Sequence, residues 1–88
     1  MGGSSSSPQH FVYILKSLQP SGRPYVGLTS NVPARLAAHN AGLSPHTARH
    51  RPWRVVVCIE FEDEKRARAF ERYLKSGSGW AFSRRHFL

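Results

Sequence analysis

The strongest constraint on the fold is the stretch at residues 53–61 (WRVVVCIEF), the most hydrophobic segment of the chain. Its β-branched and aromatic residues favour a strand. It is far shorter than the roughly 18 residues that a membrane-spanning segment needs, so it has to be covered within a sheet. Residues 10–17 (HFVYILKS) and 25–29 (YVGLT) have the same character and predict two further strands. Turn-forming residues separate these two, so they are expected to form a hairpin.

Two segments carry clear helix signals. Ser30 or Asn31 is expected to cap a helix that runs to residue 40 or 41, with Pro33 in its first turn. Acids at positions 62–64 open a second helix, which is expected to run to about residue 75. Gly77 and Gly79 are expected to end it, and residues 80–88 to form a short third helix. The predicted fold is therefore α+β, with a three-stranded antiparallel sheet flanked by helices in the order ββαβα(α).

The length of 88 residues suits one domain with one modest core. The Gly/Ser-rich start predicts that residues 1–9 are a disordered tag remnant and linker, which leaves residues 10–88 as the domain. Cys58 is the single cysteine; it lies in an apolar run and is expected to be buried rather than reactive. No membrane span or signal pattern is visible, so a cytoplasmic protein is expected.

Thirteen Lys and Arg residues stand against five Asp and Glu, a net charge of +8. Such an imbalance favours a polyanionic partner, either nucleic acid or an anionic membrane surface. Most of the cations are arginines, which suit forked contacts with phosphate, and we expect DNA rather than a membrane. The residues expected to contact nucleic acid are Arg35, Arg49, Arg51, Lys75, Arg84 and Arg85.

Glu71 is the one acid that neither a helix start nor a strand end explains. The apolar stripe of the second helix is Ala67, Phe70 and Leu74, and Glu71 falls on or beside it. A partly buried carboxylate needs a cation or several hydrogen-bond donors. Two interpretations stay open. One is a salt bridge, for instance to Lys75; the other is a ligand for Mg²⁺ or Mn²⁺, hard cations that prefer oxygen.

Two pairs of polar residues also attract attention. Arg35 and His39 share one face of the first helix, where they could clamp a phosphate and handle a proton, or simply face solvent. Tyr13 and Tyr25 lie on the two arms of the hairpin, either as site residues or as packing residues. A zinc site is a weaker alternative, because it lacks cysteines and tight ligand spacing; it would use His39, His46 and His50.

The order of these residues resembles the GIY-YIG endonuclease superfamily, above all its small stand-alone bacterial members. The family's first motif ends in a tyrosine, here Phe11-Val12-Tyr13. Its second motif matches Tyr25-Val26-Gly27, with eleven residues between the two tyrosines. Two further motifs match. The first is an arginine followed four residues later by histidine or tyrosine, here Arg35 and His39; the second is a glutamate on the following helix, here Glu71. The chain departs from the family at Phe11, usually a glycine, and at Ser83, where several members have asparagine.

The resemblance implies an enzyme that hydrolyses DNA phosphodiester bonds with a single divalent ion, Mg²⁺ or Mn²⁺, held by Glu71. It implies that a tyrosine or His39 assists deprotonation of the attacking water, and that Arg35 stabilises charge on the phosphoryl oxygens. The leading hypothesis is a structure- or repair-directed endonuclease, with or without a protein partner that supplies specificity. The alternative is a non-catalytic nucleic-acid-binding module with the same fold. We expect Tyr13, Tyr25, Arg35, His39 and Glu71 to line one concave surface at the face of the sheet.

Overall fold

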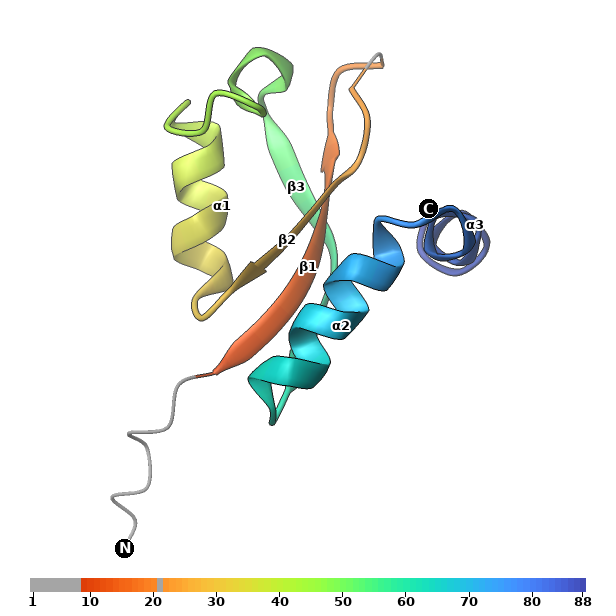
Figure 1. The fold of residues 1–88 in the computed structure, drawn as a ribbon. Helices are drawn as coiled ribbons and strands as arrows, with labels where there is room; N and C mark the ends of the chain where they lie inside the picture. Colours follow the sequence, from red (N-terminus) through yellow and green to blue (C-terminus); the bar gives the residue numbers. More distant parts are fainter. Residues whose placement is uncertain (1–8, 21) are drawn as a thin grey trace, which may run out of the picture.

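The computed structural model describes residues 9–20 and 22–88, so most of the expected tag remnant, residues 1–8, lies outside the described part. Three strands form one antiparallel sheet in the order β2-β1-β3: β1 (His10–Ser17), β2 (Tyr25–Thr29) and β3 (Trp53–Phe61). β1 is central, flanked by its hairpin partner on one side and by the long apolar strand on the other (Figure 1). The predicted α+β fold and its element order are confirmed.

The helices are α1 (Val32–Asn40), α2 (Glu64–Leu74) and α3 (Gly77–His86), with a short 3-10 turn at Ala48–His50. The side chain of Asn31 accepts a hydrogen bond from the backbone N–H of Ala34 at 3.0 Å and so caps α1, as expected. The expected start of α3 at residue 80 is wrong, because Ser76 caps this helix and Gly77 and Gly79 form its first turn. No helix in the described residues is long and apolar enough to cross a membrane.

The sheet is covered on both faces, by α1 on one side and by α2 with α3 on the other (Figure 1). Alternation along β1 divides its side chains between two cores. Val12 and Ile14 pack against Ala67 and Leu74 of α2. The second core lies under α1 and contains Tyr13, Leu15 and Trp53, with Tyr25, Val32, Leu36 and Val55 packed against it. Burial of both faces explains why the sequence of β1 is almost continuously apolar.

Cys58 is exposed, so the expectation that it is buried is wrong. It lies on β3 and pairs in register with Tyr13, which places it on the α1 side of the sheet. β3 is an edge strand, and the core under α1 includes Val55 but not Cys58. An apolar run at an edge strand can therefore leave an individual side chain exposed, while Val57 and Phe61 of the same strand pack against the core on the other face.

Candidate functional site

The ring of Tyr13 crosses the edge strand β2 above Gly27, its partner in the strand register. A Cβ atom on residue 27 would lie 2.5 Å from Cζ of Tyr13 and 2.8 Å from Cε1, well inside normal contact distance. Only glycine leaves room for the ring there. The second motif therefore has a direct physical function: Gly27 lets the phenol of Tyr13 reach across β2.

The hydroxyl of Tyr13 begins a buried chain of hydrogen bonds. It lies 3.0 Å from Nε2 of His39, and Nδ1 of that ring lies 2.8 Å from Oγ1 of Thr47. The Thr47 hydroxyl donates in turn to the carbonyl oxygen of Ser44 at 3.5 Å. This donation favours the tautomer in which Nδ1–H of His39 donates to Thr47 and Nε2 accepts the proton of Tyr13. Tyr13, His39 and Thr47 are each 1% exposed.

Burial and nearby charges set the protonation of this chain. Burial lowers the pKa of His39, and the positive charge of Arg35 lowers it further, so the imidazole is neutral at neutral pH. Burial also raises the pKa of Tyr13, which the Arg35 guanidinium opposes and the charges of Tyr25 and Glu71 reinforce. The phenol therefore keeps its proton, and both Arg35 and Glu71 lie within electrostatic range of it.

Tyr25 is the partly exposed member of the cluster. Its ring centroid lies 6.2 Å from that of Tyr13 and 4.8 Å from that of His39, which it meets edge-on. Arg35 and His39 also line a pocket of about 250 Å³ together with residues 43–45 of the following loop. The structure thus brings Tyr13, Tyr25, Arg35 and His39 together on the α1 side of the hairpin.

Glu71 reaches this region from the other side of the sheet. The helix that carries it packs on the face that Val12 and Ile14 occupy, so the expectation of one shared face is wrong. The side chain of Glu71 is 20% exposed, and its Oε2 accepts a hydrogen bond from Nζ of Lys75 at 3.1 Å. The salt bridge to Lys75 that the sequence suggested is therefore present. Because β2 is an edge strand, groups from both faces can still meet beside it.

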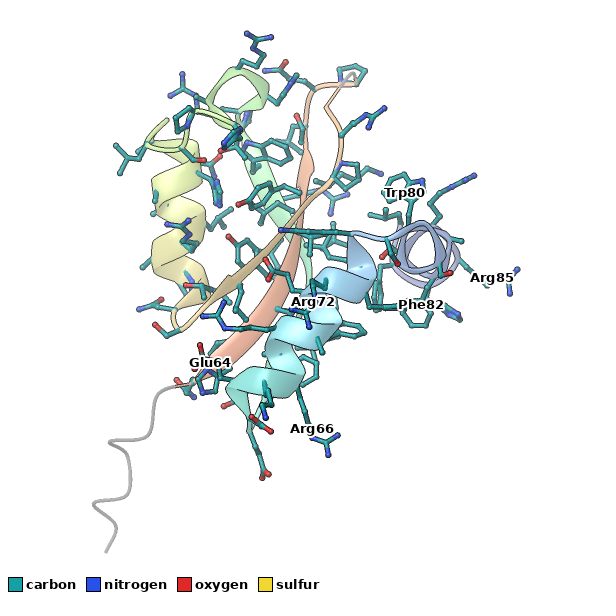
Figure 2. The ribbon with its side chains drawn as sticks, in the orientation of Figure 1. Glu64, Arg66, Arg72, Trp80, Phe82 and Arg85 are labelled. Carbon is teal, nitrogen blue, oxygen red and sulfur yellow. The ribbon has the colours of Figure 1, made fainter. Side chains whose placement is uncertain are left out.

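The other four acids lie away from the phenol. Glu60, Glu62, Asp63 and Glu64 crowd into the end of β3 and the turn that leads into α2. Glu64 pairs with Arg68 at 2.7 Å, and Glu60 accepts a hydrogen bond from the side chain of Gln9 at 3.2 Å. Among the acids, only Glu71 perturbs the pKa of Tyr13. These four residues form an acidic turn between β3 and α2, and Figure 2 shows its last member, Glu64.

The zinc alternative is wrong. Within residues 9–20 and 22–88, no three His, Cys, Asp or Glu side chains form a group that could hold a metal ion. Both ring nitrogens of His39 are engaged in hydrogen bonds, one to Tyr13 and one to Thr47. A zinc ligand would need one of these nitrogens free.

The basic residues expected to contact nucleic acid come from separate parts of the fold. Arg49 and Arg51 belong to the loop before β3, where Nε of Arg51 donates to the carbonyl oxygen of Ala48 at 2.7 Å. Arg84 and Arg85 lie in the last turn of α3, on the far side of the hairpin from that loop (Figure 1). Arg85 points away from the body of the domain (Figure 2). These side chains do not form one patch.

Thr47 is a functional candidate that the sequence did not reveal. Its backbone oxygen accepts a hydrogen bond from Nε1 of Trp53 at 2.9 Å. The side-chain amide of Asn40 donates to the backbone oxygen of Trp53 and accepts from its backbone N–H. These contacts fix the loop that presents the Thr47 hydroxyl to His39. A single threonine in a polar loop carries no periodic signal, so only the three-dimensional contact identifies it.

Residues 9–80 match the family model of the GIY-YIG catalytic domain. This chain belongs to the GIY-YIG family. The resemblance carried by the two tyrosine motifs is thereby confirmed, and the family supports a nuclease. No solved structure gives a significant match.

Curated relatives of this GIY-YIG protein come from a parasite and from bacteria. A structure-specific endonuclease subunit SLX1 homolog from Leishmania infantum is 41% identical over 69 residues, which is 70% of this chain and 10% of that protein. A UPF0213 protein from Staphylococcus haemolyticus is 38% identical over 71 residues, 80% of this chain and 84% of that one. A UPF0213 protein from Clostridium perfringens is 37% identical over 67 residues, 75% and 70% of the two chains. The chain thus spans about a tenth of the Leishmania protein and most of the bacterial ones.

Proposed function

We propose that this GIY-YIG protein is a metal-dependent endonuclease that hydrolyses phosphodiester bonds in DNA. The observation that carries the proposal is the buried chain from Tyr13 through His39 to Thr47 beside the Arg35 guanidinium. A packing tyrosine needs no neutral imidazole whose free nitrogen accepts its proton. A group that accepts a proton from water needs this arrangement, because the proton must have somewhere to go.

Proton transfer follows from the direction of these hydrogen bonds. The oxygen of Tyr13 accepts a proton from the attacking water while its own proton passes to Nε2 of His39. Thr47 holds the Nδ1–H of the imidazole, so the ring receives this proton without turning. The lowered pKa of His39 keeps Nε2 unprotonated beforehand. Tyr25, the partly exposed ring, is assigned to positioning the phosphate, and Arg35 to stabilising the charge that develops on its oxygens.

Glu71 is the residue that would hold the divalent ion. Its carboxylate is of the type that Mg²⁺ and Mn²⁺ prefer, and its partial exposure suits an ion that keeps most of its waters. Lys75, which pairs with the carboxylate here, would have to release it. When bound, the ion supplies Lewis-acid polarisation of a phosphoryl oxygen and a more acidic bound water. Glu71 is the one carboxylate that affects the pKa of Tyr13, so we assign a single divalent ion to the site.

The Leishmania relative is named as a structure-specific endonuclease subunit, which favours a structure-directed substrate and a protein partner for this chain. A repair role would follow from such a substrate. The basic loop and the end of α3, with Arg49, Arg51, Arg84 and Arg85, are proposed to contact the DNA backbone. A cytoplasmic location is part of this proposal.

The deciding experiment compares Glu71→Gln with Glu62→Gln, an equal loss of charge at the acidic turn. Supercoiled, single-stranded and branched DNA are incubated with Mg²⁺, Mn²⁺ or EDTA. We expect Glu71→Gln to lower metal-dependent cleavage by about 10²–10³-fold, the scale for one electrostatic stabiliser, while DNA binding in EDTA is unchanged. Glu62→Gln should cleave like the parent. Parent protein that binds DNA but cleaves none of these substrates would instead support the non-catalytic binding module.

A further inference from the structure

Trp80 is an exposed tryptophan that the fold does not use for aromatic packing. Its side chain lies in the first turn of α3, and the residue is 43% exposed. Within the described residues, Phe70, Tyr73, Phe82 and Phe87 of this region all make ring-to-ring contacts, whereas no such contact involves Trp80. An indole this exposed leaves part of its ring surface available for stacking by a ligand.

Trp80 lines a pocket of about 500 Å³ between α2, α3 and the segment that leads into β2. That volume lies within the range of about 300–1,000 Å³ typical of ligand sites. Figure 2 shows Trp80 on the side of α3 that faces the hairpin, while Arg85 points away from it. The remaining lining residues are Arg23, Pro24, Tyr25, Val26, Leu74 and Lys75.

The lining of this pocket has the chemistry of a nucleotide site. The lining combines two cations, Arg23 and Lys75, with apolar and aromatic side chains. No acid is among the lining residues. Stacking on an aromatic ring binds the flat face of any base, and cations nearby hold the backbone phosphates. An apolar peptide would offer no charged partner to Arg23.

The pocket also adjoins the proposed catalytic cluster. Tyr25 is part of its wall and at the same time contacts the rings of Tyr13 and His39. Lys75 is part of its wall and pairs with Glu71. A strand with one phosphate at Tyr25 would therefore present a neighbouring base to Trp80.

We propose that this pocket is a nucleobase-stacking subsite, in which Trp80 stacks on a base next to the phosphate at Tyr25, and Arg23 and Lys75 contact the flanking phosphates. The inference rests on the proposed function for its location beside the scissile bond. Its binding chemistry can be measured without cleavage.

The test uses the Glu71→Gln protein in EDTA, so that binding is recorded alone. The probes are a fluorescein-labelled eight-nucleotide thymidine strand and the same strand with its four central bases removed, which keeps the charge. Trp80→Ala should weaken binding of the first probe by about tenfold, within the range reported for loss of one stacked base, and leave binding of the second unchanged. The dependence on salt should stay the same, because no cation is lost.

Two variants complete the design. Trp80→Phe keeps a stacking ring and should retain most of the affinity for the thymidine strand. Arg85→Ala removes a cation that points away from the pocket, so any loss of affinity should be equal for both probes. Circular dichroism melting confirms that each variant is folded.

Equal affinity of the parent and Trp80→Ala for the thymidine strand would overturn the subsite, and so would an equal loss on both probes. Either result leaves the proposed nuclease intact if Glu71→Gln still blocks cleavage. Conversely, if the parent cleaves no DNA while Trp80→Ala shows the base-dependent loss, the nuclease proposal fails and the subsite stands.

Discussion

Replacing Gly27 with alanine tests whether the position of the Tyr13 phenol controls both stability and cleavage. The added Cβ would lie 2.5 Å from Cζ of Tyr13, against an ordinary contact of 3.4 Å or more, so the ring has to retreat by about 0.9 Å. The hydrogen bond to His39 measures 3.0 Å, and a shift of this size is enough to take it out of range. The change therefore acts on the first link of the proton path.

Two opposing effects set the expected stability. Overpacking a well-filled core costs about 1–3 kcal/mol. Replacing glycine with alanine stiffens the unfolded chain and offsets about 0.4–1 kcal/mol of that cost. We expect a net loss of about 1 kcal/mol in the free energy of unfolding, measured by urea titration. Misplacing a catalytic group by about 1 Å typically costs on the order of 10²-fold in rate, so cleavage should fall much further than stability alone explains.

Leu28→Val is the matched control, because Leu28 is the other neighbour of Gly27 in β2, packs on the opposite core and lies outside the pocket at Trp80. It should lose about as much stability, at roughly 0.8 kcal/mol per buried methylene, and keep normal cleavage. A double-mutant cycle with Tyr13→Phe then isolates the phenol: in the absence of the hydroxyl, Gly27→Ala should reduce cleavage little further. Normal cleavage by Gly27→Ala, or additive losses in the cycle, would refute this reasoning.

Three further predictions concern the groups around the phenol. Thr47→Val should shift His39 toward the Nε2–H tautomer, visible in ¹⁵N–¹H spectra of the imidazole, and lower cleavage about 10-fold or more, whereas Thr47→Ser should keep both near normal. Since the folded-state pKa of His39 is below its usual 6.5, its contribution to stability is complete above that pH and is lost as the pH falls through the folded-state value. Urea titrations at about pH 7.5 and about pH 5 should show this loss, and His39→Gln should reduce it. Arg35→Ala should reduce turnover by about 10²–10³-fold but DNA affinity only slightly, while Arg84→Ala should lower both modestly; equal effects of the two would make Arg35 part of a general basic surface.

The sequence predicts most of the strands and helices because each of them has a strong local signal. Apolar runs predicted all three strands, and the cap at Asn31 predicted the start of α1. The sequence does not predict the start of α3, because Gly77 and Gly79 are residues that typically end a helix. Gly79 is required for another reason: a Cβ there would lie 2.6 Å from Cα of Leu74, so the close approach of α3 to the end of α2 excludes a side chain. Such a long-range contact leaves no local pattern.

The sequence predicts the residues of the site but not their arrangement. Order and spacing identified Tyr13, Tyr25, Arg35, His39 and Glu71, but the face of the sheet that each would occupy depends on how the helices dock. α1 and α2 cover opposite faces, and helical periodicity cannot distinguish that arrangement from a shared face. The sequence also does not predict that Thr47 contacts His39. Thr47 lies in a loop, and the side chain of Trp53 fixes the position of that loop by a long-range contact.

The acidic turn between β3 and α2 gives the molecule an electric dipole. Four of the five acids lie within residues 60–64, so the rest of the chain carries thirteen cations and one anion. As the protein nears a polyanion, this separation of charge produces a torque that turns the acidic turn outward. Encounters would then be oriented before any contact forms, and the rate of association would fall as ionic strength shortens the range of the field. A domain this small thereby gains a preferred orientation of approach from five consecutive residues.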